Sequence, residues 1–271
     1  MNRSFTFLLL LCFSLNATAQ ISPPGLGRAQ ACDWTAIGLR QDLDTLKKWQ
    51  SVTYVGMGRK SNPDNENPFY KPALWVFNQE FYHKFRQNWQ YSFALSYRQE
   101  REYSSRYPYE QATPGTEQEF RVYGRLSYIV KTLRIKFVPT IRQEFRKFYN
   151  PDFSNASEDF QLRTRLRVQL TLNLDKAAQH RMIGSAEELF SIAENSQPRY
   201  WSDFAYHESR FNLYYSYSPP KLPLIFDVGY MYNLVGAQNP YGVHYLAFDI
   251  IVENPFRLLR HAKKEANENL E

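Results

Sequence analysis

The chain has 271 residues with 33 Lys and Arg and 27 Asp and Glu, a formal net charge of +6, and a length that suits one large domain. Its mean hydropathy is −0.57, and charges soon interrupt every apolar stretch after the first twenty residues, which excludes a transmembrane helix there. Aromatic residues nonetheless make up 17% of the chain, including 20 Tyr and 20 Phe. A membrane β-barrel combines these properties, because only alternate residues of each strand meet lipid.

The first residues predict an export signal. Asn2 and Arg3 begin a short polar start, residues 5–15 form an apolar run, and residues 17–19 have the small-x-small pattern that signal peptidase cuts. We therefore expect residues 1–19 to be a signal peptide. After cleavage Cys32 is the only cysteine, so the mature chain cannot form an internal disulfide.

Residues 20–48 are expected to form a periplasmic segment before the barrel. Within residues 33–48, Ile37, Leu39, Leu43 and Leu46 have spacings loosely compatible with one helical stripe, which predicts a short helix. Two alternatives to the periplasm stay open for this helix: it plugs the barrel lumen, or it rests on the membrane.

Ten segments with period-two alternation, each bounded by turn residues, predict strands. They span residues 49–60, 73–86, 89–102, 117–130, 133–148, 159–174, 180–192, 201–217, 222–235 and 243–254. Most reach the nine to eleven residues, roughly, that a tilted strand needs to cross hydrocarbon. The alternation is weakest in the seventh segment, so eight or twelve strands are the neighbouring alternatives.

The connections between these segments alternate between longer and shorter stretches, starting with the long SNPDNENPFYK and the short QN. Outer-membrane barrels have long outward loops and short periplasmic turns. We therefore predict an all-β, closed, antiparallel up-and-down barrel over residues 49–255 in the outer membrane of a Gram-negative bacterium. An even strand number places both termini in the periplasm. Residues 256–271 would form a charged tail, and Phe256 would be an internally placed signal for the barrel-insertion machinery.

The segment LRTRLRVQLTLNL, residues 162–174, shows how the two faces are assigned. Its leucines would face lipid, and Arg163, Arg165 and Arg167 would face the lumen, where an isolated charge is costly. Glu144 on the preceding strand would lie across from Arg163 or Arg165. The residues expected to line the lumen are Arg98, Glu100, Arg121, Arg125, Arg142, Glu144, Arg163, Arg165, Arg167, Glu208, Arg210, Asp227 and Asp249.

A soluble sandwich or lipocalin-like barrel would instead bury the apolar face and expose the charged one. The positions of the aromatic residues favour the membrane barrel, because a lipid–water boundary attracts amphipathic rings. Such residues near predicted strand ends are Trp49, Trp75, Trp89, Tyr97, Tyr149, Tyr200 and Trp201.

Two non-enzymatic functions are compatible with the charged lumen. The charges would either pair with one another as packing, or line a narrow pore that favours a small anionic solute. The barrel would also serve as a scaffold for surface loops, whose Tyr107, Tyr109, Phe153 and Tyr241 could contact an extracellular ligand. Its other expected partners are outer-membrane lipid and the insertion machinery.

An enzymatic alternative rests on His207 and Ser209, which alternation places on one strand face. An imidazole there could deprotonate the hydroxyl for acyl transfer. The pair resembles the His-x-Ser of outer-membrane phospholipases and lipid A deacylases, but Arg210 stands where those families have Asn. The sequence has no metal or cofactor motif and no basic patch for nucleic acid, so neither is expected.

Short motifs in three strands carry a family resemblance. They are the Arg-x-Arg strand at residues 163–167, the Glu-x-Arg strand at residues 208–210 and the Asp-x-Gly-Tyr strand at residues 227–230. From about Trp49 to Asn254 the chain resembles the Bacteroidota family of exported β-barrels catalogued as domain of unknown function 2490. The resemblance implies an outer-membrane barrel and no assigned chemistry.

Overall fold

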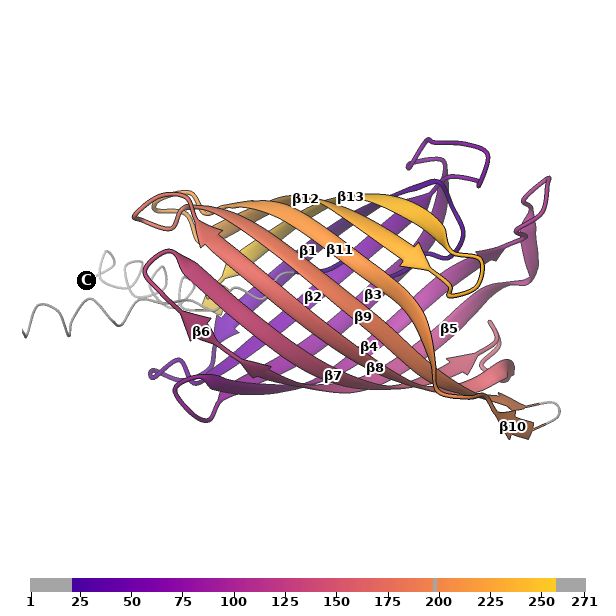
Figure 1. The fold of residues 1–271 in the computed structure, drawn as a ribbon, viewed down its shortest axis with the longest axis horizontal. Coiled ribbons are helices and arrows are strands. Elements are labelled where there is room, and N and C mark those ends of the chain that lie inside the picture. The colour runs from indigo at the N-terminus through magenta and orange to yellow at the C-terminus, as the bar shows by residue number, and fades with distance from the viewer. Residues whose placement is uncertain (1–20, 197–198, 257–271) are drawn as a thin grey trace, which may run out of the picture.

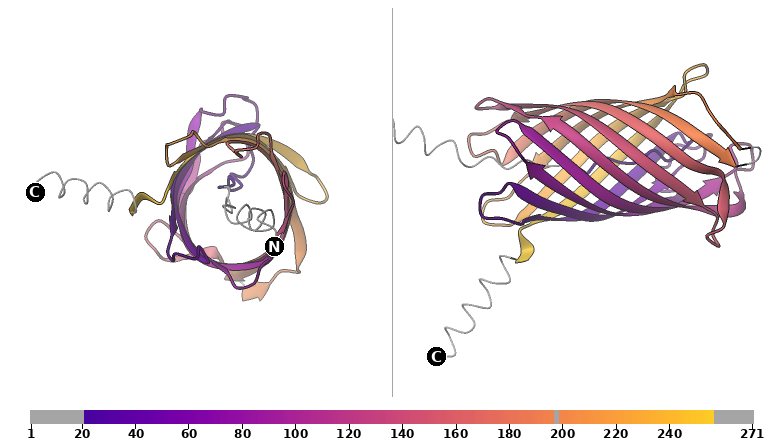
Figure 2. Two further views of the ribbon diagram at one scale, coloured as in Figure 1. Left: turned by 90° about the vertical axis from the view of Figure 1, so that its left-hand side faces the viewer. Right: turned by 90° about the horizontal axis from the view of Figure 1, so that it is seen from below.

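The computed structural model describes residues 21–196 and 199–256, which form a closed, mixed β-barrel (Figures 1 and 2). Within these residues, no helix is long and apolar enough to cross a membrane. Two short strands, β6 (Val130–Lys131) and β10 (Arg199–Trp201), pair with β7 and β9 at the barrel ends. The eleven strands of the wall are β1 (Ala31–Asp42), β2 (Trp49–Lys60), β3 (Lys71–Lys84), β4 (Trp89–Tyr103), β5 (Gln111–Tyr128), β7 (Ile135–Tyr149), β8 (Asn155–Asn173), β9 (His180–Ser196), β11 (Ala205–Tyr217), β12 (Leu224–Val235) and β13 (Tyr241–Glu253).

The strand absent from the sequence prediction is β1, so the barrel begins at Ala31 and not at Trp49. The expected helix in residues 33–48 is wrong: β1 pairs with β2 and β13 along its length. Ile37 and Leu39 lie on its exposed face, while Leu43 and Leu46 lie in the turn that follows. Their spacing, which suggested a helical stripe, belongs to one strand and one turn.

The eleventh strand changes how the barrel closes. In a sheet of successive antiparallel neighbours, an odd number of strands gives the first and the last the same direction. β1 and β13 accordingly pair in parallel, with Trp34 opposite Ala247 and Leu39 opposite Val252. The prediction of an even, fully antiparallel barrel is therefore wrong at this one seam, and all other pairs of the wall are antiparallel.

The connections fall into two sets, one at each end of the barrel. The turn end carries residues 43–48, 85–88, 129–134, 174–179 and 218–223, and the loop end carries residues 61–70, 104–110, 150–154, 199–204 and 236–240. The two sets differ less in length than the sequence predicts. The strands themselves extend into the predicted loops, since β8 begins at Asn155 and spans 19 residues.

Two turns at the turn end share one construction. In each, an Asp carboxylate accepts hydrogen bonds from the backbone N–H groups four and five residues later. Asp44 serves Lys48 and Trp49, and Asp175 serves Gln179 and His180, the last at 2.8 Å. The backbone N–H of His180 donates to the charged carboxylate and so holds the pKa of Asp175 below its ordinary value. In each turn, the Asp thus bonds the backbone at the start of the turn to the backbone at its end.

The two faces of the wall have opposite chemistry. Leu166 and Leu170 of β8 are 47% and 48% exposed on the outside, whereas Arg165, which directly precedes Leu166, is 6% exposed and points inward. The same alternation exposes apolar side chains on strands around the barrel, including Ile37, Val55, Phe77, Leu95, Val122, Ile141, Leu213, Val228 and Leu246. A soluble barrel with an apolar core and a charged exterior does not fit this arrangement.

Aromatic side chains gather at both ends of the exposed face. At the turn end Trp49 stacks on His83 at 4.1 Å, and Trp89 contacts Tyr128 at 4.9 Å. At the loop end the chain of rings includes the following contacts: Trp75 with Tyr97, Tyr97 with Phe120, Phe120 with Tyr149, Phe160 with Trp201 and Phe190 with Tyr206. The apolar band therefore lies between two aromatic belts.

Candidate functional site in the barrel lumen

The lumen has a charged wall and an apolar wall. All thirteen residues expected to line it lie on the inner face, where Arg98, Arg121, Arg163, Arg165, Arg210, Glu144, Glu208, Asp227 and Asp249 are buried. The apolar wall consists mainly of inward side chains from β1, β12 and β13, including Trp34, Met231, Val243 and Tyr245. The sheet thus brings ionic and apolar surfaces to face one another across a narrow interior.

Glu144 is the centre of the charged wall. The register places it opposite Arg163, and its carboxylate lies 2.6 Å from the Nε atoms of both Arg142 and Arg165. Arg121 reaches the same carboxylate at 3.4 Å. Because Glu144 has no exposed surface, its charge is compensated by these arginines and not by bulk water.

Two further acids, Glu119 and Glu80, compensate other arginines of the inner face. Glu119 pairs with Arg121 at 2.6 Å and with Arg146 at 2.7 Å. Glu80 pairs with Arg125 at 3.1 Å and accepts a hydrogen bond from Tyr123. Sequence reasoning did not single out Glu80, whose inward position follows only from continuing the alternation of β3. Glu144, Glu119 and Glu80 together therefore lie within ion-pair distance of five arginines, namely Arg121, Arg125, Arg142, Arg146 and Arg165.

Residues 21–30 occupy the interior of the barrel (Figure 2, indigo segment inside the ring). Ile21 lies among inward residues near the middle of the barrel, and the backbone N–H of Gln30 donates to Ser61 at the loop end. The chain then reverses direction and enters β1. Since this path starts β1 at the loop end, it also accounts for the parallel seam. The expected periplasmic position of this segment is replaced by a position in the lumen.

Small residues in the wall make room for the segment. A Cβ added to Gly58 would lie 3.0 Å from the Leu26 side chain, and one added to Gly38 would lie 3.1 Å from Ile21. Leu26 is completely buried and Ile21 is 3% exposed. The two side chains therefore pack against glycines of β1 and β2.

Inward polar groups also bind the segment backbone. Arg98 donates to the Gly25 carbonyl and Lys60 donates to the Leu26 carbonyl, both at 2.8 Å, while the Leu26 N–H donates to the Tyr245 hydroxyl at 2.9 Å. Gly27 has a φ of 69°, which glycine adopts without strain. These contacts hold an extended segment without regular hydrogen bonding of its own.

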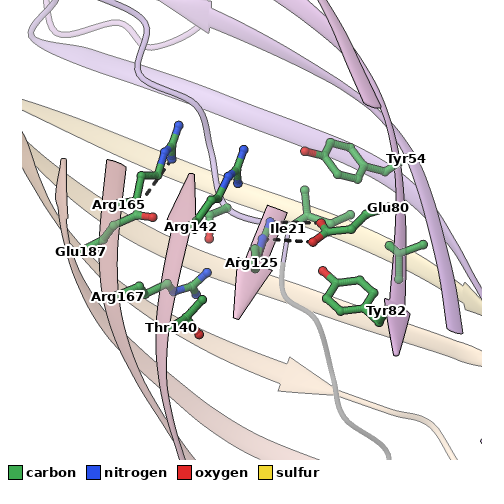
Figure 3. Close-up of a pocket in the computed structure, with 12 residues that line it drawn as sticks. Ile21, Tyr54, Glu80, Tyr82, Arg125, Thr140, Arg142, Arg165, Arg167 and Glu187 are labelled. Carbon is green, nitrogen blue, oxygen red and sulfur yellow. Dashed lines mark hydrogen bonds and ion pairs between the residues drawn. The ribbon is translucent and has the colours of Figure 1, made fainter. Parts of the chain in front are cut away.

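Only small spaces remain beside the segment. A cavity of about 50 Å³ lies beside Ile21. Figure 3 shows Arg125, Arg142, Arg165 and Arg167 on one side of Ile21, and Tyr54, Glu80 and Tyr82 on the opposite side. A second cavity of about 40 Å³ lies beside residues 22–24. Each is large enough for a few water molecules. Neither resembles a wide aqueous channel.

His207 lies in a bulge of β11, where the register with β9 shifts between Tyr206 and Glu208, whereas Ser209 is in regular pairing. The Ser209 hydroxyl donates to Glu188 at 2.8 Å and lies 2.8 Å from the Tyr206 hydroxyl. His207 instead lies near the inward charges of Arg163, Glu208 and Arg210. The alternation on which the predicted pair depends is thus interrupted between its two members.

The aromatic residues expected at the surface loops contact neighbouring groups. Tyr107 packs edge-on against Tyr109, Phe153 contacts Tyr149, and Arg28 lies over the Tyr241 ring at 5.6 Å. Tyr107 and Phe153 remain largely exposed. They are available for contact at the loop end.

No protein-family model matches this chain, and no curated protein matches it either. In the part of the chain that the structure describes, no three His, Cys, Asp or Glu side chains are grouped as a metal site would require. The lumen segment was the main functional feature that sequence reasoning did not place. Its Pro-Pro-Gly-Leu-Gly composition predicts neither a strand nor a helix, and nothing in it specifies a lumen.

Proposed function

We propose that this protein is a non-enzymatic, integral outer-membrane β-barrel whose own N-terminal segment closes its lumen. Two observations support the membrane assignment: the apolar side chains on the outside, and the aromatic belts that border them. Exposing so large an apolar band to water would be unfavourable, whereas lipid would cover it. The barrel would then hold surface loops at one membrane face.

The observation that carries the closed state is the position of residues 21–30. They pack on glycines of the apolar wall and accept hydrogen bonds from Arg98 and Lys60. The Arg and Glu pairs fill the opposite side. The barrel would therefore conduct, as a narrow pore, only when residues 21–30 leave the lumen.

The experiment that tests the proposal is a planar-bilayer recording on the refolded mature protein and on a variant lacking residues 21–30. We expect the unaltered protein to show little steady conductance and the deletion variant to show discrete openings. Replacing Arg165 and Arg167 by Gln in the deletion variant should reduce its preference for anions, since these guanidinium groups line the emptied lumen.

Heat-modifiable gel mobility and extraction only by detergent should first establish that both proteins form membrane barrels. A Gly58→Val variant provides a second test, because its side chain would displace Leu26 without shortening the chain. Equal conductance of the folded unaltered, deleted and Gly58→Val proteins would overturn the closed state. Recovery of the unaltered protein in the soluble periplasmic fraction would overturn the membrane assignment.

The more detailed assignments are part of the same proposal. Membership in the family catalogued as domain of unknown function 2490 is supported by the inward Arg163, Arg165 and Arg167. Periplasmic placement of the turn end follows from its shorter connections. The signal peptide and nearly all of the charged tail lie outside the described residues. The contacts of Ser209 with Glu188 and Tyr206 favour the non-enzymatic function over a lipid hydrolase.

A further inference from the structure

A cavity of about 300 Å³ opens at the turn end of the lumen. Lys131, Lys136 and Arg181 line it, and we call it the turn-end mouth. Neutral hydrogen-bonding side chains and one acid, Glu253, contribute the rest of its polar lining. The neutral residues are Thr132, Thr171, Asn173, Gln179 and Ser218. Its volume corresponds to roughly ten water molecules, so a small solute has room to enter.

Two of the cations face one another directly. Lys131 of β6 and Lys136 of β7 are register partners in the hairpin. Among the described residues, neither ammonium group has a hydrogen bond or an ion pair. Like charges opposite one another destabilise a strand pair. Burial disfavours the charged form of Lys136, and Lys84 and Arg181 also lie close enough to repel its ammonium group.

The acids near the mouth do not neutralise these lysines. Glu253 lines the cavity, but its carboxylate pairs with Arg40 at 3.1 Å. Asp227 lies near Arg181, whose guanidinium also donates to Ser216 at 3.0 Å. Glu144, by contrast, is surrounded by arginines within ion-pair distance. The network of paired Arg and Glu side chains therefore ends before the turn-end mouth.

We propose that the turn-end mouth binds a small, multiply charged anion of the phosphate class. Two ammonium groups and one guanidinium group converge on one cavity, and both kinds of cation suit phosphate oxygens. Thr132, Asn173 and Gln179 supply neutral groups for the remaining hydrogen bonds. Because the cations point into the lumen, the ligand is a soluble anion from the aqueous compartment at this end, and not a lipid headgroup. This binding goes beyond the closed-barrel proposal and requires no conduction.

The test is calorimetric titration of inorganic pyrophosphate into the full mature protein, refolded in a phosphate-free maltoside detergent at low salt. We expect saturable binding that weakens as salt is added. A Lys131→Gln/Lys136→Gln variant should bind pyrophosphate at least about tenfold more weakly, because two charge-assisted contacts are lost. Lys176→Gln is the matched control, because this exposed lysine lies in a turn at the same end and outside the cavity.

Thermal unfolding gives a second readout that does not require the variant to bind. Removal of the opposed charges should raise the Tm of the double variant, and pyrophosphate should raise the Tm of the unaltered protein only. Absence of saturable binding by the unaltered protein would overturn the proposal. Equal affinities of the unaltered protein and the double variant, or binding that appears only after anionic phospholipid is added, would also overturn it.

Discussion

Buried charged residues in this lumen depend on oppositely charged partners to offset the cost of their burial. A carboxylate taken out of water loses several kcal/mol of solvation, to an order of magnitude, and recovers it only with well-placed opposite charges. Glu144 has no exposed surface and lies within 3.4 Å of Arg121 and 2.6 Å of Arg142 and Arg165. It therefore compensates three arginines that would otherwise repel one another.

The first prediction concerns this carboxylate. Glu144→Gln should lower the free energy of unfolding by about 3–5 kcal/mol, because it leaves buried arginines without a counter-charge. Denaturant titration of the protein in lipid vesicles, followed by the gel-mobility shift, measures the change. Glu66→Gln, at an exposed acid of the loop end, should leave the midpoint unaltered. Equal midpoints for Glu144→Gln and the unaltered protein would show that the network contributes no stability.

At the scale of the element, β1 and β2 are joined by more than their backbone hydrogen bonds. Trp34 of β1 points inward, is 1% exposed, and donates from its indole N–H to Asp249 at 3.1 Å. Its ring lies over Gly56 of β2, where any Cβ would be only 2.4 Å from two ring carbons. The glycine is thus needed for close approach of the ring to the strand.

A substitution at this contact should weaken the barrel. Gly56→Ala should cost about 1–3 kcal/mol, because the Trp34 ring must leave its site and its bond to Asp249. The matched control is Gly124→Ala on the outer face of β5, where the nearest atom to an added Cβ is the Ser92 oxygen at 3.6 Å. Thermal unfolding of both variants measures the difference, and similar losses would contradict the role of Trp34.

For the whole molecule, the lumen segment and the strand number are linked. A chain that passes through the barrel before its first strand begins that strand at the loop end, so β1 runs parallel to β13. The alternative ten-strand barrel would pair β2 directly with β13. The two architectures therefore place different strands beside β13: β1 in the observed barrel and β2 in the alternative.

Cross-linking distinguishes these architectures. With Cys32 replaced by Ser, cysteines at the register partners Ile37 and Ile250, both on the outer face, should form an intramolecular link with a short thiol-specific reagent. Cysteines at Ile37 and Val228 should not, because β12 is not a neighbour of β1. Gel mobility under non-reducing conditions reports the link. A link between residues 37 and 228, without one between residues 37 and 250, would contradict the parallel pairing of β1 with β13.

Local sequence determined most of the wall. Alternation of period two identified ten of its eleven strands, and it assigned Leu166 and Arg165 of β8 to the outer and inner face. The same rule extends to β1, where Ile37 and Leu39 face outward. The strand was missed because Leu43 and Leu46 in the following turn completed an apparent helical stripe. Side-chain direction follows from the pleat of each strand, and neighbouring residues are sufficient to reveal it.

Tertiary structure alone decided what fills the lumen and how the barrel closes. Residues 21–30 form no regular element of their own, and their position depends on Gly38, Gly58, Arg98 and Tyr245, which are distant in sequence. The parity of the strand number follows from that path and not from any local pattern. The unpaired Lys131 and Lys136 likewise become visible only once every inward acid has been assigned to its partner. These properties depend on contacts among strands that are distant in sequence, so they cannot be predicted from any single stretch of residues.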